Sequence, residues 1–312
     1  MPKVSIIGVG DVGATIAYTL QLSGLATEIV LVDLDQERAK GQAMDMGHGL
    51  FFTPPARIAA GGYEDCAGSD LIVVTAGARQ RPGESRTELT ARNAEICRNI
   101  IRALRPWVAE AKVLVITNPV DVMTYVVLKE LGGPSGRVFG SGTVLDSARF
   151  RYELSRRCGV DPRSVHAYVI GEHGDSEVFL WSHVNIGGVP LETFCRGCPK
   201  GCMPEARGEI EEAVRRSAYH IIEAKGYTNY GVSLAVTRIA GAVLRDEKSV
   251  LTVSTLLQGE YGLEGLSVSV PCVVGAKGVE RVLETFLPPD ETEALLSSAE
   301  KVKGFLDDLY PA

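Results

Sequence analysis

Short apolar runs alternate with amphipathic stretches through the first half of the chain. Each run is apolar at consecutive positions, which is typical of strands in a parallel sheet that is covered on both faces. Between the runs, apolar residues recur at helical spacing, most clearly from Leu89 to Leu104, where the helix should end before Pro106. This alternation predicts a doubly wound α/β domain. The predicted strands are Val4–Ile7, Ile29–Val32, Leu71–Val74, Val113–Ile116 and Val138–Phe139.

The pattern changes near residue 142. Apolar residues recur at helical spacing from Ile210 to Ile222 and again from Val232 to Val243. The first of these helices should stop at Gly226, since glycine commonly ends a helix, and residues 227–231 should separate the two. We therefore expect a second domain that begins near this point.

Antiparallel strands and a final helix are expected in the last part of the chain. Residues 249–256 and 266–270 alternate as antiparallel strands do. Asp290 and Glu293 have the spacing of a capping box at the start of the last helix. The prediction is an α/β protein, with a doubly wound parallel-sheet domain at 1–141 and an α+β domain at 142–312. The apolar face of the last helix is predicted as Leu295, Leu296, Ala299, Val302, Phe305 and Leu306.

Length, charge and cysteine content narrow the class of protein. A chain of 312 residues suggests two domains at about 150 residues per domain. Its 32 Lys and Arg residues against 39 Asp and Glu residues leave a net charge of −7, which argues against a general nucleic-acid binder. No apolar run approaches the length of a membrane span, and the first residues lead directly into a predicted strand instead of a signal peptide. The 7 cysteines are odd in number and mostly scattered, which favours a reducing cytoplasm.

A glycine-rich turn follows the first predicted strand. Gly8, Gly10 and Gly13 form the pattern G-x-G-x-x-G, and the required strand, turn and helix context is present. Such a turn lets a dinucleotide pyrophosphate approach the backbone at the start of the helix. Asp33 ends the second predicted strand, where a carboxylate can bind both ribose hydroxyls and repel a 2′-phosphate, which favours NAD over NADP. The alternative is a glycine turn that serves packing only.

Three polar groups are candidates for catalysis. His173 lies between glycines in Gly171–Ser176, and a histidine is well suited to exchange a proton near neutral pH, although a surface-loop histidine is the alternative. Asp146 and Arg149 are three residues apart on a predicted helix, so both can face one site or form a simple surface ion pair. Arg86 closes a polar Pro-Gly loop that is either a mobile lid or a solvated loop.

Together these motifs resemble the lactate/malate dehydrogenase family, and within it the bacterial L-lactate dehydrogenases. The resemblance extends from Val4 to the last helix. It rests on the glycine turn with Asp33, on Thr117-Asn118-Pro119-Val120-Asp121, on the Asp146/Arg149 helix and on Gly171-Glu172-His173-Gly174-Asp175. It implies a Rossmann domain followed by a substrate domain, reversible hydride transfer between NADH and pyruvate to give L-lactate, and a homotetramer assembled as a dimer of dimers.

The resemblance also implies a role for each site residue. His173 would donate the proton to the carbonyl oxygen, Asp146 would hold its imidazole, and Arg149 would bind the substrate carboxylate through two hydrogen bonds. Arg86 would arrive with a closing loop and stabilise negative charge on the carbonyl oxygen. No metal is expected. The remaining implied residues are Asn118 and Thr228 in the substrate pocket, and Gly8, Gly10, Asp11, Val12, Gly13, Asp33, Gly77, Asn118 and Val232 at the cofactor.

The choice between pyruvate and oxaloacetate depends on the lid. In this family the deciding position lies six residues before the lid arginine, and here it is Gln80, where a malate enzyme typically has arginine. A neutral Gln80 leaves the second carboxylate of oxaloacetate unpaired, and Glu84 adds negative charge nearby. We therefore predict lactate specificity. Malate dehydrogenase is the alternative, since Arg79 and Arg81 flank Gln80 and either could pair with that carboxylate if the register slipped.

Two further features lie outside this chemistry. Arg151 and His166 occupy the positions that bind fructose 1,6-bisphosphate across a subunit interface in activated bacterial relatives; an ordinary surface arginine and a structural histidine are the alternative. Cys195, Cys198 and Cys202 have C-x2-C-x3-C spacing, which is not a family feature. They could bind zinc with a fourth ligand such as Cys158, form a redox-labile loop, or belong to a variable surface loop.

Overall fold

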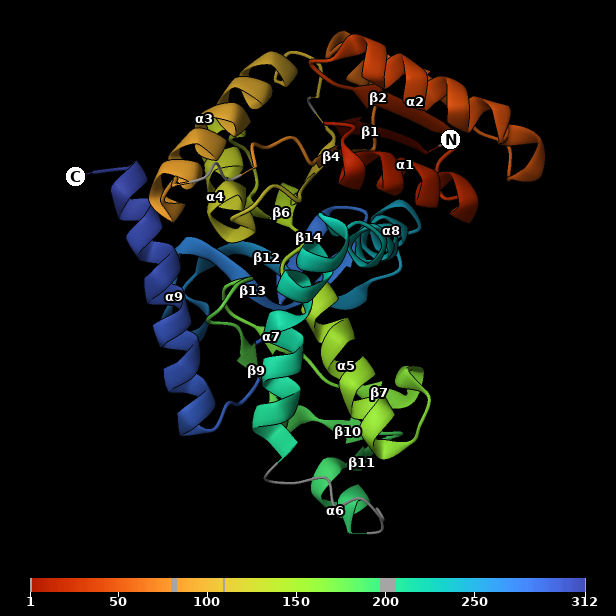
Figure 1. Ribbon diagram of the computed structural model, residues 1–312. Helices are drawn as coiled ribbons and strands as arrows, with labels where there is room; N and C mark the ends of the chain where they lie inside the picture. Colours follow the sequence, from red (N-terminus) through yellow and green to blue (C-terminus); the bar gives the residue numbers. More distant parts are fainter. Residues whose placement is uncertain (1, 80–82, 109, 197–205, 312) are drawn as a thin grey trace.

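The computed structural model describes residues 2–79, 83–108, 110–196 and 206–311 (Figure 1). In the view of Figure 1, a parallel sheet with its helices occupies the upper part. Small sheets and two long helices form the lower part, and the C-terminal helix runs along one side of both. In the described part of the chain, no helix is both long and apolar enough to cross a membrane.

Among the described residues the main sheet has nine strands, and the six from the first half of the chain are parallel. β1 (Lys3–Ile7) pairs with β2 (Glu28–Val32) on one side and with β4 (Leu71–Val74) on the other. The order of all six parallel strands is β3-β2-β1-β4-β5-β6, so the chain connections change direction between β1 and β4. Ligands of such sheets bind at the carboxyl ends of the strands at this switch point. The outer strands are β3 (Arg57–Ala60), β5 (Lys112–Val115) and β6 (Val138–Gly140).

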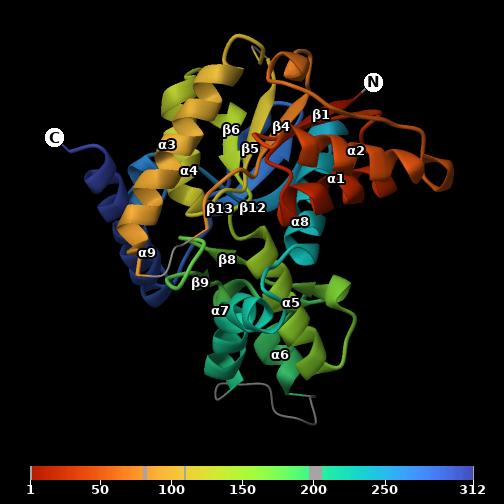
Figure 2. The ribbon, with the colours of Figure 1, turned by 45° about the horizontal axis from the view of Figure 1, so that its top comes forward.

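Helices cover both faces of these strands. Figure 2 shows α3 and α4 on one side and α1 and α2 on the other, as expected for a doubly wound sheet. Burial on both faces explains why β1, β2, β4 and β5 are almost continuously apolar. The helices are α1 (Asp11–Ser23), α2 (Gln36–His48), α3 (Arg86–Leu104) and α4 (Val120–Leu131).

The five predicted strands are confirmed to within one residue at each end. β3 was not predicted. It lies at the edge of the sheet and pairs only with β2 among the described strands, and its four residues are exposed or half-buried. Its apolar residues are Ile58 and two alanines, all half-buried, so its sequence signal is weaker than that of the Val- and Ile-rich runs that identified most of the other strands.

The second half adds antiparallel strands to the same sheet. β12 (Ser249–Gln258), β13 (Glu264–Gly275) and β14 (Gly278–Val282) pair in sequence order, and β12 joins β6 where Ser254 faces Gly140. A Cβ on Gly140 would lie 3.1 Å from the Cβ of Ser254, so a glycine favours this close pairing. The pattern of the sequence predicted the antiparallel pair but not its attachment to the parallel sheet.

A separate apolar cluster holds the lower part together. Phe150 of α5 (Val144–Cys158) packs edge-on against Phe179 at 5.0 Å and against Trp181 at 4.8 Å between ring centroids. α7 (Ala206–Lys225) adds Ile210 and Val214 to this cluster. The remaining strands are β7 (Val165–His166), β8 (Val169–Ile170), β9 (Val178–Phe179), β10 (Asn185–Ile186) and β11 (Val189–Pro190).

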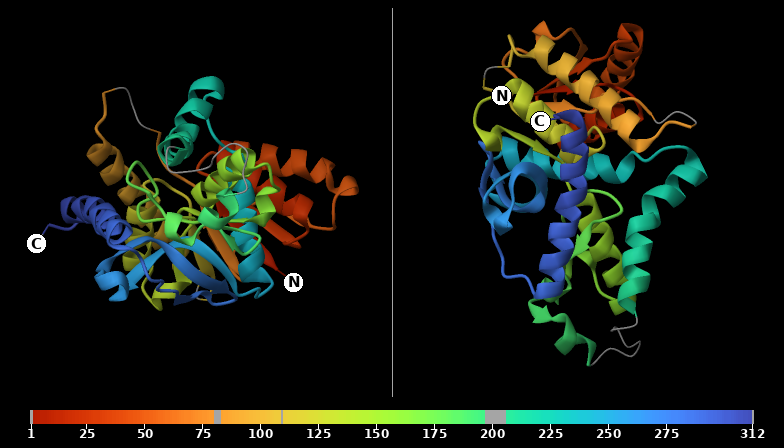
Figure 3. Two further views of the ribbon diagram at one scale, coloured as in Figure 1. Left: turned by 90° about the horizontal axis from the view of Figure 1, so that it is seen from below. Right: turned by 90° about the vertical axis from the view of Figure 1, so that its left-hand side faces the viewer.

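α8 (Tyr230–Leu244) returns to the upper part and packs against α1, and α9 (Pro289–Leu309) runs along one side of the molecule (Figure 3). α6 (Leu191–Cys195) is a short helix at the far end of the lower part. Short 3₁₀ turns lie at Leu50–Phe52, Glu64–Cys66, Ser135–Arg137, Pro162–Ser164, Trp181–His183 and Glu260–Gly262.

Three details of the predicted helices are wrong. α9 begins at Pro289, whose ring suits the first helical position, so Asp290 and Glu293 lie inside the first turn and form no capping box. Leu296 is 42% exposed and does not belong to the buried face of that helix. The break between α7 and α8 is shorter than predicted, because Tyr230 is already the first residue of α8.

Candidate active site

The glycine turn lies at the switch point of the sheet. Gly8 has φ of +94°, and a Cβ on it would lie 2.7 Å from the backbone of Ala76. A Cβ on Gly13 would collide with the carbonyl oxygen of Gly8. Gly10 is different, since nothing among the described atoms lies within 4 Å of where its Cβ would be. Two glycines therefore allow the turn to pack, and the third leaves open space in front of the backbone.

The start of α1 is arranged to receive an anion. Its N-cap is Gly10, so no side chain caps the helix and its first N–H groups are left for a ligand. Asp33 follows β2, and its carboxylate accepts hydrogen bonds from the N–H groups of Val9 at 2.7 Å and Asp35 at 3.0 Å. These bonds hold the carboxylate beside the turn. Asp11, also predicted at the cofactor, forms an ion pair with Arg79.

His173, Asp146 and Arg149 are brought together by the approach of α5 to the loop after β8. His173 Nδ1 donates a hydrogen bond to Asp146 Oδ2 at 2.6 Å. The other carboxylate oxygen accepts from Arg149 Nη1 at 2.8 Å. The Asp146 side chain is 3% exposed, whereas the His173 ring is 26% exposed. The imidazole is therefore held from inside the protein and open on its other edge.

The charges around His173 favour its protonated form. Burial alone would lower the pKa of the imidazole, but the negative charge of Asp146 and the hydrogen bond to it dominate and raise that pKa to about 9. Burial acts to raise the pKa of Asp146, yet His173 and Arg149 outweigh it, and the pKa of the carboxyl is lowered. At neutral pH the pair is an imidazolium and a carboxylate.

Asp121 holds the backbone of the same loop. Its Oδ2 accepts the N–H of His173 at 2.7 Å, and its Oδ1 accepts from Ser269 Oγ at 3.3 Å. Burial raises the pKa of Asp121 to about 6. In the sequence Asp121 is part of the motif Thr117–Asp121 with no predicted role, and only the fold brings α4 and the histidine loop into contact.

Glu177 is a buried carboxyl that the sequence analysis missed. It is 4% exposed, and its Oε1 has no hydrogen-bond partner among the described residues. Burial, followed by the negative charge of Asp146, raises its pKa to about 8, so the group is mainly neutral at pH 7. Its position before the apolar run Val178–Leu180 was the available signal, because an acid in such a run is seldom solvated.

Arg86 is the first residue of α3 and not the last residue of the loop. Ser85 and Glu88 form a capping box around it. Its Nη2 donates to Asp175 Oδ2 at 2.8 Å, two residues beyond His173, so the fold places this arginine at the histidine loop. Gln80 lies outside the described residues.

The other predicted site residues lie in two places. Asn118 and Gly77 lie near each other, because the side chain of Asn93 on α3 donates to the carbonyl oxygen of Asn118 at 2.9 Å and accepts from the N–H of Ala78, next to Gly77, at 2.8 Å. The second place is formed by Thr228 and Val232. Val232 lies on α8 and packs against the main core, while half-buried Thr228 lies in the break before that helix. Asn229, next to Thr228, donates to Thr15 Oγ1 of α1 at 3.0 Å, which holds this break beside the glycine turn.

Arg151 contacts the residues that follow His166 in the lower part. Arg151 Nε donates to the carbonyl oxygen of Ala167 at 3.0 Å, and the guanidinium carbon lies 4.9 Å from the ring centroid of Tyr168. His166 is exposed on β7.

The cysteine-rich segment is only partly described. Cys195 is the last residue of α6 and half-buried, whereas Cys198 and Cys202 lie outside the described residues. Within the described ranges, no group of three or more His, Cys, Asp or Glu side chains is arranged to hold a metal ion.

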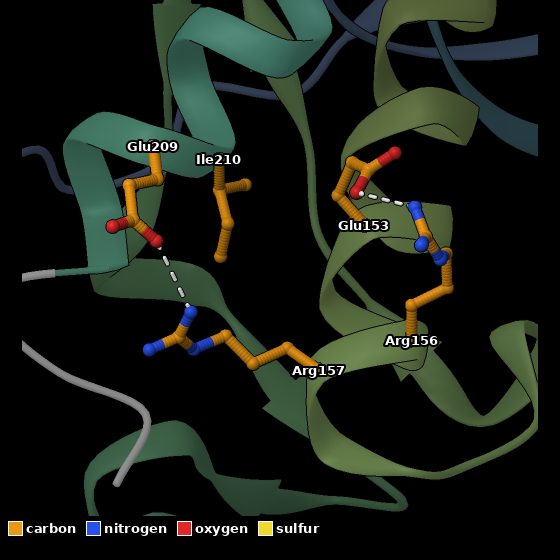
Figure 4. A pocket seen from close by; sticks show the side chains of 5 residues that line it. All are labelled: Glu153, Arg156, Arg157, Glu209 and Ile210. Carbon is orange, nitrogen blue, oxygen red and sulfur yellow. Dashed lines mark hydrogen bonds and ion pairs between the residues drawn. The ribbon is translucent and has the colours of Figure 1, made fainter. Parts of the chain in front are cut away.

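A pocket of about 510 Å³ lies between α5 and α7 (Figure 4). It contains none of the predicted site residues. Its two carboxylates pair with its two guanidiniums, Glu209 with Arg157 at 3.2 Å and Glu153 with Arg156 at 3.5 Å. The charges of this pocket are satisfied within the protein, so it is not a candidate for the chemistry described above.

Comparison with known proteins identifies the family. Residues 2–140 match the NAD-binding domain of lactate/malate dehydrogenases, and residues 143–309 match their alpha/beta C-terminal domain. The chain belongs to the lactate/malate dehydrogenase family, and it is an NAD-dependent oxidoreductase with a Rossmann-type first domain.

Individual relatives cover the whole chain. An L-lactate dehydrogenase of Thermoanaerobacter pseudethanolicus is 51% identical over 99% of each chain. One of Acetivibrio thermocellus is 48% identical over 98% of this chain and 97% of its own. A crystal structure of a lactate dehydrogenase from a deep-sea metagenome library superposes with a TM-score of 0.97 at 40% identity, covering 99% of this chain and 98% of that one. The minor L-lactate dehydrogenase of Enterococcus mundtii gives a TM-score of 0.96 at 38% identity, covering 100% and 99%.

Proposed function

We propose that the protein is an L-lactate dehydrogenase that reversibly reduces pyruvate with NADH to L-lactate and NAD. The observation that carries this proposal is the cluster of His173, Asp146 and Arg149, with Arg86 at the same loop. It combines a proton donor with two cationic groups for a small carboxylate substrate. The full-length relatives named L-lactate dehydrogenase support the same reading.

The protein's own groups provide the acid–base half of the reaction. Protonated His173 gives its Nε2 proton to the carbonyl oxygen of pyruvate, while Asp146 stabilises the cation and holds the ring through Nδ1. In lactate oxidation the neutral ring removes that proton. Arg149 binds the substrate carboxylate, and Arg86 stabilises negative charge on the carbonyl oxygen.

The residues around the glycine turn fit the cofactor. Gly8 and Gly13 let the turn pack, Gly10 leaves open space, and the uncapped start of α1 offers N–H groups to a pyrophosphate. Asp33 binds the adenosine ribose. Bound NADH supplies the hydride. The other residues assigned to the cofactor are Asp11, Val12, Gly77, Asn118 and Val232, and Asn118 and Thr228 also line the substrate pocket. We assign the boundary between the two domains to residues 141 and 142.

Preference for pyruvate over oxaloacetate depends on Gln80. Glu84 was expected to add negative charge to the lid. In the structure it pairs with Arg92 at 2.7 Å, so its charge is balanced and the preference depends on Gln80 alone. Arg79 forms an ion pair with Asp11 at the start of α1, so its charge is directed to the glycine turn. This pairing makes Arg79 a weaker candidate for binding the second carboxylate of oxaloacetate, as a malate dehydrogenase would require.

The test is an NADH-oxidation assay with pyruvate and oxaloacetate measured side by side. We expect the kcat/KM for pyruvate to exceed that for oxaloacetate by more than tenfold, a difference of about 1.4 kcal/mol in transition-state binding. An equal or higher value for oxaloacetate would identify a malate dehydrogenase.

We also propose that fructose 1,6-bisphosphate activates the enzyme through Arg151 and His166. The position of Arg151 supports this, because it binds the carbonyl oxygen of Ala167, the residue after the exposed His166, and a guanidinium is well suited to bind a phosphate. An Arg151→Gln/His166→Ala double variant should keep its basal rate but no longer be activated by fructose 1,6-bisphosphate. Activation that persists in this variant would contradict the assignment.

Two broader expectations accompany this function. A homotetramer built as a dimer of dimers is supported by large apolar side chains exposed on α1 and α8, among them Leu22 and Leu234, and light scattering would measure the mass.

A reducing cytoplasm is supported by Cys66, Cys97 and Cys272, which are buried as free thiols.

A further inference from the structure

Arg86 shares a closed set of hydrogen bonds with two residues that have no role so far. Its Nη2 donates to Asp175 Oδ2 at 2.8 Å and to the hydroxyl of Tyr219 at 3.2 Å. The same hydroxyl donates to Asp175 Oδ1 at 2.9 Å. The three residues come from the start of α3, the histidine loop and α7, so this set joins three separate parts of the fold.

These bonds contribute little as ordinary surface contacts. The side chains of Arg86 and Asp175 are 61% and 51% exposed, and ion pairs at that exposure add little to stability. Their effect on orientation is larger. The hydroxyl of Tyr219 both accepts and donates, which fixes the positions of the guanidinium and the carboxylate relative to each other.

The main chain of Arg86 is fixed as well. Ser85 and Glu88 form the capping box at this end of α3, and the carbonyl oxygen of Arg86 accepts from Thr90 Oγ1 at 2.8 Å. The arginine is therefore held at its backbone and at one terminal nitrogen. Nε and Nη1 bind no other described residue, so they are left to donate to a substrate.

We propose that Asp175 and Tyr219 are positioning residues for Arg86, which set the guanidinium at a defined separation from His173. The proposal rests on the proposed function, since a carbonyl oxygen that receives a proton from one group and charge stabilisation from another requires both at once. Asp175 suits this task because it is two residues from His173, so one short loop carries the proton donor and the anchor of the arginine. Small misplacements of such groups are costly to the rate.

The experiment is a double-mutant cycle of Asp175→Asn and Tyr219→Phe, each with Arg86→Gln. With Arg86 present, we expect Asp175→Asn to lower kcat for pyruvate reduction about 10- to 100-fold, with a smaller loss for Tyr219→Phe. The dissociation constant for NADH should not change. With Arg86→Gln, each second substitution should change kcat less than twofold, because the group that they position is absent. The isotope effect from deuterated NADH should rise in both single variants.

Matched controls separate positioning from a general loss of contacts. Glu130→Gln on α4 removes an ion pair with Arg102 of α3, in which Nε and Oε1 are 2.9 Å apart. Tyr152→Phe removes an exposed hydroxyl on α5. Both should leave kcat unchanged. The proposal would be overturned if Asp175→Asn or Tyr219→Phe lowered kcat by the same factor in the Arg86→Gln background as in the wild type. An unchanged or higher kcat in Asp175→Asn would also overturn it. The wild-type rates test the proposed function separately: if oxaloacetate is preferred, the cycle is measured with oxaloacetate and the same criteria apply.

Discussion

The Nδ1 atom of His173 lies 2.6 Å from Oδ2 of Asp146, a carboxylate that is 3% exposed and also holds Arg149. Buried charges are retained in proteins when they are paired and hydrogen-bonded. Here both conditions are met by residues of one helix and one loop. This pairing makes the imidazole basic, which sets the pH range in which it can serve as a proton donor.

Asp146→Asn should move the pH dependence of pyruvate reduction. In the wild type, the rate should fall as pH rises through about 9, where His173 loses its proton. Without the carboxylate, burial opposes the protonated form and only the charges of Asp121 and Glu177 still favour it, so the pKa of His173 should fall from about 9 towards its ordinary 6.5. At pH 8 the protonated fraction, and with it kcat/KM, should then drop by up to about thirtyfold. Asp161→Asn, which changes an exposed carboxyl paired with Arg163, is the control. An alkaline limb that stays near pH 9 would contradict this account.

His173→Asn should retain NADH binding and lose most turnover. The substitution removes the proton donor, while the glycine turn that holds the cofactor is untouched. The loss in kcat should be about 10²- to 10⁴-fold. Fluorescence titration with NADH and steady-state assays measure the two quantities, and a kcat close to that of the wild type would mean that the donor lies elsewhere.

Glu177→Gln should change how pyruvate binding depends on pH. The glutamine imitates the neutral acid, so KM should match the wild type near pH 7. As pH rises through about 8, wild-type Glu177 ionises and brings negative charge close to Arg149, so only the wild-type KM should rise several-fold. Glu192→Gln on α6 serves as the control. Parallel KM profiles for wild type and Glu177→Gln would exclude this residue from the site.

Asp33→Ser should narrow the preference for NAD over NADP. The carboxylate binds ribose and repels a 2′-phosphate, and serine does neither as well. Because Asp33 also accepts the N–H of Val9, the affinity for both cofactors can fall, so the ratio of their kcat/KM values is the decisive quantity. Asp35→Ser, at the N-cap of α2, should leave that ratio unchanged.

Gln80→Arg should shift preference from pyruvate towards oxaloacetate. The new guanidinium pairs with the second carboxylate of oxaloacetate and is left unpaired beside the methyl group of pyruvate. The ratio of the two kcat/KM values should change on the order of a thousandfold or more. Glu84→Gln is the matched control, because it changes charge in the same loop at a carboxylate that is already paired with Arg92. A ratio within a few-fold of the wild type would transfer the role to Arg79 or Arg81.

Local patterns were sufficient for most of the fold. Leu71–Val74 is apolar at every position because β4 is buried on both faces, and that property is visible in four consecutive residues. β3 at the sheet edge and the start of α9 at Pro289 were missed or misplaced. In both cases the sequence signal is weak or competes with another, since an edge strand is half-exposed and an acidic pair inside a first turn imitates a capping box.

The sequence by itself determined the alternation of strands and helices, the glycine turn, and the spacing of Asp146 and Arg149 on one helix face. Each of these depends on residues that are neighbours in the chain. Only the tertiary structure decided that Asp121 holds the backbone of His173, that Glu177 is buried beside Asp146, and that Asp175 and Tyr219 reach Arg86. Those contacts join residues far apart in sequence, and burial and charge, which set the pKa values, arise only when the elements pack against one another.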